Sequence, residues 1–138
     1  MAKALKKEYS RIIDANFNRC KEGLRVCEDL CRFVWNNQRQ TKKFKNIRHQ
    51  LTAIISKLGL NVLVKSRDID GDIGKKTTSL ESKRKNIKDI FYANIQRVKE
   101  SIRVLEELTK LADQRLAESC KRIRYQIYAL EKEILSRL

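Results

Sequence analysis

The 138-residue sequence contains no proline, only four glycines and few aromatic residues. Proline and glycine interrupt regular structure, so their scarcity beside abundant Lys, Arg, Glu, Leu and Ile favours an all-α fold. The same composition excludes collagen-like chains, disulfide frameworks, β-sandwiches and β-barrels. A hydrolytic triad has little support, because there is one histidine and no nucleophile elbow.

Long apolar runs are also missing. The longest apolar stretch, residues 51–64, is interrupted by Ser56, Lys57 and Asn61, which argues against a membrane-spanning helix. The N-terminal segment MAKALKKEYS contains basic residues without a following apolar block. We therefore expect no signal peptide, no membrane association and a cytoplasmic location.

Positive charge is abundant, with 32 Lys and Arg against 17 Asp and Glu, a formal net charge of +15. Such an excess attracts phosphate groups on nucleotides, nucleic acid or anionic lipid. Lysines alternate with glutamates along the chain and do not form one basic tail, which argues against a disordered nucleic-acid-binding arm. A basic helical nucleic-acid binder remains the least favoured of the alternatives.

An internal repeat organises the chain. Residues 15–30 (ANFNRCKEGLRVCEDL) realign at an offset of 78 with residues 93–108 (ANIQRVKESIRVLEEL), with nine identities. A second match, at an offset of 76, pairs IRHQLTAI from Ile47 with IRYQIYAL from Ile123. Each half is therefore predicted to be a long helix followed by a second helix, so that one helical hairpin is used twice.

Apolar periodicity sets the predicted helices. They cover residues 12–34, about 41–58, about 81–111 and about 114 to the end, with Gly59 as the residue that ends the second helix. The predicted fold is a single all-α, four-helix-bundle-like domain over residues 1–138. Repeat 1 spans about 10–58, a longer central loop about 61–79, and repeat 2 about 81–138. Neighbouring helices are expected to pack antiparallel.

Polar side chains fall within the apolar arc of each long helix. At 100° per residue, Asn16 and Arg19 lie among apolar positions of the first helix, and Asn94 and Arg97 repeat this in the third. Burial of such groups is costly unless they are paired. A chain that places both in the arc twice therefore has a structural or functional reason.

Two interpretations of these polar positions stay open. In the structural one, Arg19 pairs with Glu22 or with Glu100 of the other copy, and Asn16 caps a neighbouring backbone. In the functional one, the small residues Gly23 and Ser101 leave open a pocket between the helices for a ligand.

Charged residues continue the repeat beyond these positions. They alternate at i,i+3 and i,i+4 spacing in both copies: Glu22, Arg25, Glu28 and Asp29, then Glu100, Arg103, Glu106 and Glu107. This pattern is typical of a solvated helix face with weak ion pairs, except that Glu22 borders the expected pocket.

Three cysteines, Cys20, Cys27 and Cys31, share one helix face. Their counterparts in the second copy are valine, leucine and threonine, which favours a role as small core residues over metal binding. Cys120 is expected to be a lone reduced thiol. His49 corresponds to Tyr125, which favours packing or hydrogen bonding over metal ligation.

The central segment carries Arg67, Asp68 and Asp72 among two glycines, followed by the basic-hydroxyl run of residues 75–78. Arginine suits phosphate and aspartate suits a divalent cation, so this segment is a candidate phosphate or magnesium site. Neither the P-loop nor the EF-hand pattern fits it. A flexible acidic turn is the alternative.

Several blocks together resemble a known family. RIIDANFNRCKEGLRVCEDLCRF, IRHQL, SRDIDGDIG, ANIQRVKESIRVLEELTKL and IRYQIYALE are similar to the helical domain that precedes the barrel in some bacterial thiamine-phosphate synthases and that also occurs as a separate short protein. The resemblance covers about residues 9–134. For the stand-alone members it implies phosphorylation of hydroxymethylpyrimidine phosphate to the diphosphate with ATP. We expect synthase activity to be absent, because the chain ends before a barrel begins.

The resemblance also implies site residues, with ATP and Mg²⁺ as cofactors. The expected substrate-binding residues are Asn16, Arg19, Glu22, Arg25, Asn94, Arg97, Glu100 and Arg103. The expected catalytic residues are Arg67, Asp68 and Asp72, of which Asp68 and Asp72 would hold the metal. In this hypothesis the arginines grip phosphates, the asparagines recognise the aminopyrimidine, and Glu22 or Glu100 fixes the arginines.

A different class of function is kept as the alternative. In it, the chain is a non-catalytic domain that binds a pyrimidine phosphate or docks on a thiamine-phosphate synthase. Whether a second copy of the chain takes part, as in a homodimer, is left open.

Overall fold

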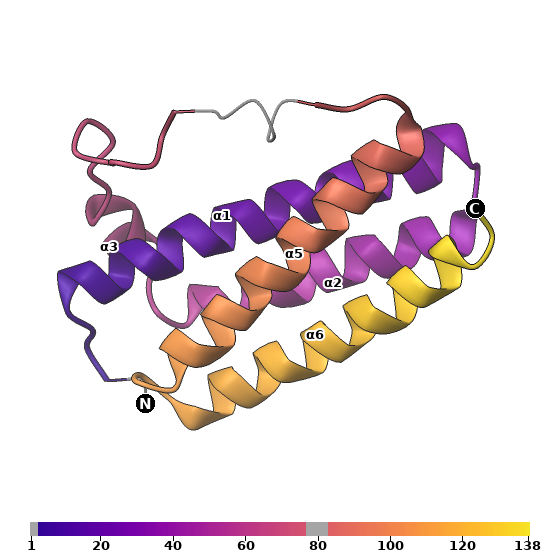
Figure 1. The fold of residues 1–138 in the computed structure, drawn as a ribbon. Coiled ribbons are helices and arrows are strands. Elements are labelled where there is room, and N and C mark those ends of the chain that lie inside the picture. The colour runs from indigo at the N-terminus through magenta and orange to yellow at the C-terminus, as the bar shows by residue number, and fades with distance from the viewer. Residues whose placement is uncertain (1–2, 77–82) are drawn as a thin grey trace.

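The computed structural model describes residues 3–76 and 83–138, and this part of the chain is helical and contains no strand (Figure 1). The helices are α1 (Lys7–Asp29), which continues into a π-helical turn η1 (Leu30–Val34), then α2 (Gln38–Ser56), α3 (Leu60–Lys65), α5 (Ile87–Thr109) and α6 (Gln114–Leu135). The all-α prediction is confirmed.

Side-chain caps fix the starts of three long helices. Asn37, Asn86 and Asp113 precede α2, α5 and α6, and each side-chain oxygen accepts a hydrogen bond of 2.9 Å from a backbone N–H two or three residues later. After α2, Gly59 adopts a φ of +86°, a conformation that L side chains rarely tolerate. Gly59 follows the helix as predicted, but α2 itself ends earlier, at Ser56 with Lys57 as its C-cap, and Gly59 is the N-cap of α3.

The central segment differs from the prediction in two places. Residues 60–65, most of them in the expected loop, form α3, because Leu63 is buried against the bundle and this packing stabilises a short helix. Helix α5 begins at Ile87, after the non-helical residues 83–86. Residues 77–82, which include Thr77 and Thr78 of the basic-hydroxyl run and the expected helix start at residue 81, lie outside the described residues.

The four long helices form two antiparallel hairpins, α1–α2 and α5–α6, packed side by side (Figure 1). Helix α1 runs antiparallel to α5 as well as to α2, and α6 lies beside α2 (Figure 1). One cluster of buried apolar side chains draws on all four helices and on α3, with Phe44 and Phe91 as its largest fully buried members. The repeated hairpin in the sequence is therefore a repeated hairpin in the fold.

Helices α1 and α5 pack tightly at Gly23. A Cβ atom at this position would lie 2.7 Å from Val98 Cγ2 and 3.1 Å from the carbonyl oxygen of Asn94. The counterpart of Gly23, Ser101, is buried, and its hydroxyl donates to the carbonyl of Arg97 within α5 at 2.7 Å. The expectation that Gly23 and Ser101 leave open a pocket is therefore wrong, because the neighbouring helix fills the space.

All four cysteines are free and buried, which confirms their role as core residues. Burial raises the pKa of Cys20 and Cys31 to about 12 and that of Cys120 to about 11. No helix within residues 3–76 and 83–138 is long and apolar enough to cross a membrane.

The buried thiols give a testable prediction. In the native protein at about pH 8, Ellman's reagent should react with none of the four cysteines within minutes, and with all four after denaturation in guanidinium, because the reactive species is the exposed thiolate. The unfolded chain releases these protons near its ordinary thiol pKa, below the raised folded values. The thiols therefore contribute fully to stability below about pH 8.5 and progressively less as the pH rises. Rapid labelling of the native protein would contradict the core assignment.

Candidate functional site

A surface groove of about 710 Å³ lies between the first half of α1 and the segment that follows α3. It is lined by Glu8, Arg11, Ile12, Asp14, Ala15, Asn16, Asn18, Arg19, Arg67, Asp68, Ile69 and Asp72. Five of the predicted site residues therefore meet in one place, although the first and the last, Asn16 and Asp72, are more than fifty positions apart in the sequence. By contrast, the groove of about 270 Å³ between α2 and α6 contains none of them.

An ion pair joins the two walls of the groove. Arg67 Nε donates to Asp14 Oδ2 at 2.5 Å, and Arg67 Nη2 donates to Asp14 Oδ1 at 3.1 Å. The Asp14 side chain is 6% exposed and that of Arg67 is 41% exposed. The hydrogen bond from Arg67 to the Asp14 carboxylate raises the pKa of the guanidinium, which stays charged. Asp14 was not among the site residues predicted from the sequence.

The two other predicted catalytic residues shape the segment after α3. Asp68 Oδ1 accepts the backbone N–H of Gly71, and Asp72 Oδ1 accepts that of Gly74, both at 2.9 Å. A Cβ on Gly71 would lie 2.3 Å from Asp68 Oδ2, so a side chain there would displace this turn. Both carboxylates are exposed, and each keeps its second oxygen available to a cation.

The matched asparagines bind their own helices. Asn16 Nδ2 donates to the carbonyl of Ile12 at 2.9 Å, and Asn94 Nδ2 donates to that of Ile90 at 2.8 Å. Asn16 is buried at the edge of the groove, and Asn94 is half-buried on α5. These bonds satisfy one donor of each amide and leave the amide oxygen for another partner.

The matched arginines do not point inward. Arg19 and Arg97 are exposed, and neither guanidinium group forms a hydrogen bond or ion pair within the described ranges. The expectation that both lie inside the apolar arc and line a shared cavity is therefore wrong, because a long side chain at the edge of the arc reaches water. Arg19 lies in the groove, whereas Arg97 does not.

The other predicted substrate-binding residues lie outside the groove. Glu22 and Glu100 are exposed, without a contact to Arg19 or Arg97 in the part of the chain that the structure describes. Arg25 binds Glu28 and Asp29, and Arg103 binds Glu106 and Glu107. The structure therefore brings together the first-repeat residues Asn16 and Arg19 with the central segment, and leaves the second-repeat set apart.

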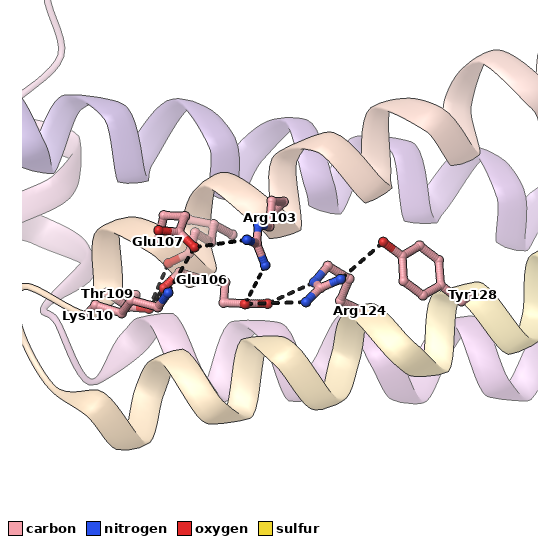
Figure 2. Close-up of polar contacts among 8 residues, drawn as sticks. Arg103, Glu106, Glu107, Thr109, Lys110, Arg124 and Tyr128 are labelled. Atoms are coloured by element: carbon pink, nitrogen blue, oxygen red, sulfur yellow. Dashed lines mark hydrogen bonds and ion pairs between the residues drawn. The ribbon is translucent and has the colours of Figure 1, made fainter.

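Two buried carboxylates form an ion-pair arrangement that occurs once in each repeat. Glu106, 4% exposed, accepts from Arg124 Nε at 2.8 Å and from Arg103 Nη1 at 2.9 Å, and Arg124 also donates to the Tyr128 hydroxyl (Figure 2). In the first repeat, Glu28 accepts from Arg48 Nε at 3.0 Å.

The prediction of a solvated face is thus wrong for the two glutamates. The missed signal is that an arginine recurs at the matched position of the second helix in both hairpins, where it reaches back to the buried carboxylate.

Three guanidinium groups and four carboxylates line the groove. Arg11 and Arg19 have no partner among the described residues, and Arg67 adds a third guanidinium. Guanidinium groups bind phosphate through paired N–H donors, and the exposed carboxylates of Asp68 and Asp72 suit a hard divalent cation. The groove therefore offers guanidinium donors that suit a phosphate group and two exposed carboxylates that suit a cation.

A family comparison matches this chain along most of its length. The model of the ThiD2 family covers residues 11–133, and the chain belongs to this family. It is 41% identical over 126 residues to a thiamine-phosphate synthase of Nostoc punctiforme, and 38% identical over 136 residues to that of a Synechocystis strain. These alignments cover 91% and 98% of this chain but 35% and 38% of the relatives.

The chain therefore spans about a third of the length of these curated relatives. The same proportion holds for the thiamine-phosphate synthase of Rhodopirellula baltica, which is 36% identical over 135 residues, or 97% of this chain and 36% of the relative. No solved structure is significantly similar to the chain.

Proposed function

We propose that the chain acts in thiamine biosynthesis by binding hydroxymethylpyrimidine phosphate in the α1 groove and transferring a phosphoryl group to it from ATP. The observation that carries this proposal is the convergence of Asn16 and Arg19 on α1 with Arg67, Asp68 and Asp72 after α3. The names of the relatives support the pathway, and the resemblance of the sequence blocks supports the reaction.

Charge neutralisation is the main requirement of this reaction. The γ-phosphoryl group of ATP leaves ADP and is accepted by a phosphate oxygen of the pyrimidine monophosphate, so several anionic groups must approach one another. Arg11 and Arg19, which lack partners among the described residues, bind and orient these groups. Arg67 adds its remaining donors. The oxygen of the Asn16 amide accepts a hydrogen bond from the aminopyrimidine.

Asp68 and Asp72 are the proposed magnesium ligands, as a pair, because no group of three or more His, Cys, Asp or Glu residues in the described part of the chain could hold a metal ion. Mg²⁺ is bound by one or two carboxylates together with water and substrate phosphates, and does not need a cage of protein ligands. Asp68 and Asp72 would hold it, each through the oxygen that the turn does not use. The ion would supply charge neutralisation for the phosphate groups.

A non-catalytic role is the second candidate, and a specific observation favours it. Asp68, Asp72 and Arg67 already have partners within the chain, so the groove can be a rigid receptor for a pyrimidine phosphate without any transfer step. The chain would then deliver or sense this ligand for a thiamine-phosphate synthase. The synthase of Nostoc punctiforme carries a segment similar to this chain over about a third of its length.

The deciding experiment combines turnover and binding. Purified chain is mixed with ATP, Mg²⁺ and hydroxymethylpyrimidine phosphate, and products are followed by ³¹P NMR. We expect equimolar ADP and pyrimidine diphosphate, and at least a hundredfold slower turnover in the Asp68→Asn/Asp72→Asn variant, because the metal loses its ligands. Binding of the monophosphate without ATP consumption would select the receptor role. If the protein shows no turnover and no binding of the monophosphate, both candidate functions are rejected.

A further inference from the structure

Among the described residues, three carboxylates are buried, namely Asp14, Glu28 and Glu106. Each binds an arginine from another segment: Arg67, Arg48 and Arg124, respectively. A buried carboxylate without a cationic partner is strongly unfavourable, so these contacts are required wherever the carboxylate is kept. The question is why the chain keeps each carboxylate.

The internal repeat separates the three into two kinds. Glu28 and Glu106 occupy equivalent positions in α1 and α5, so the hairpin uses this ion pair twice as part of its construction. The equivalent of Asp14 is Tyr92, which is 55% exposed. The hairpin therefore folds without a carboxylate at this position, and Asp14 is present for a reason specific to the first repeat.

That reason lies in the groove. Asp14 receives two hydrogen bonds from Arg67, through Nε and Nη2, so the planar guanidinium is fixed in orientation. Asn18 Nδ2 also lies 3.5 Å from Asp14 Oδ1 and supports the carboxylate from one turn further along α1. Since a guanidinium has five N–H donors, two bonds to Asp14 leave three for a ligand.

We propose that Asp14 is a positioning residue, which acts through Arg67 to hold the segment after α3 against α1 and to orient the remaining Arg67 donors toward a phosphorylated ligand. This inference rests on the proposed use of the groove. It assigns Arg67 an orienting partner, Asp14, which holds the guanidinium in its binding orientation before a ligand arrives. Arg11 and Arg19 have no such support.

A double-mutant cycle tests the proposal. Binding of hydroxymethylpyrimidine phosphate is measured by calorimetry for Asp14→Asn, Arg67→Gln and the double variant. We expect each single variant to weaken binding about tenfold, and the double variant to bind no more weakly than Arg67→Gln, because Asp14 acts only through Arg67. Glu28→Gln is the matched control, since it breaks a buried ion pair outside the groove and should leave binding unchanged at a temperature where it is folded. The proposal would be overturned if the loss of affinity in the double variant equalled the product of the losses in the two single variants.

Hydrogen exchange of the ligand-free protein separates this proposal from the proposed function. In Asp14→Asn, the amides of residues 66–72 should exchange at least tenfold faster than in the wild type, while Glu28→Gln leaves them unchanged. If the wild type binds no pyrimidine phosphate but the exchange result holds, the positioning role stands and the ligand assignment fails. Unchanged exchange in Asp14→Asn would reject the positioning role whatever the protein binds.

Discussion

Replacement of Glu106 by alanine is expected to lower the free energy of unfolding by about 3–5 kcal/mol, the usual cost of removing one partner from a buried ion pair. Arg124 is 11% exposed, and two of its nitrogens donate to Glu106, at 2.8 and 3.4 Å. Without the carboxylate, the guanidinium keeps the Tyr128 hydroxyl, at 3.1 Å (Figure 2). Its other remaining contacts within the described residues are with the rings of Tyr125 and Tyr128. These partners are neutral and do not compensate the lost charge.

Urea unfolding followed by circular dichroism measures this loss. Glu107→Ala is the control, because the Glu107 carboxylate is exposed and binds Arg103 and Lys110 on the surface, where ion pairs contribute little. A Glu106→Leu/Arg124→Leu variant should recover most of the stability, since replacing both charges by apolar groups leaves no buried ion unpaired. If Glu106→Ala unfolds at the same urea concentration as Glu107→Ala, the assigned ion pair is not important for stability.

Local patterns in the sequence were sufficient to predict the fold. Helix positions follow from apolar spacing between nearby residues. The two hairpins follow from the repeat, in which segments 76 to 78 residues apart have matching sequences. The exceptions are tertiary. Residues 60–65 are helical because Leu63 packs on the bundle, and Glu28 is buried because Arg48, on the next helix, covers it. Neither contact changes the local sequence pattern, so the pattern alone predicted a loop at the first of these positions and a solvated helix face at the second.

The candidate site was predicted only in part. The residue types of Arg67 and Asp68 indicated phosphate or magnesium chemistry, and the resemblance implied Arg19. Where these residues meet depends on how the segment after α3 folds back on α1. At Gly23, where a cavity between α1 and α5 was expected, Val98 of α5 fills the space. The signal for Asp14 was present as a break in the repeat, where the second copy has Tyr92.

This asymmetry leads to a prediction on two matched residues. Arg19→Gln should lower kcat/KM for the pyrimidine phosphate by about a hundredfold or more, because a charged hydrogen-bond donor to phosphate is lost. Arg97→Gln, the same change at the equivalent position of α5, should lower it less than tenfold, because Arg97 does not line the groove. Both side chains are exposed and have no partner within the described residues, so neither change should alter stability measurably.

Steady-state kinetics on the two variants decide whether one repeat or both bind the ligand. The sequence resemblance assigns equal roles to the two arginines, whereas the groove contains only the first. Equal losses in Arg19→Gln and Arg97→Gln would mean that the ligand contacts both long helices, and the site would then extend beyond the groove along the outer face of α1 and α5. A loss confined to Arg19→Gln would mean that duplication supplied the scaffold and that only the first copy, with Asp14 and the segment after α3, became the binding site.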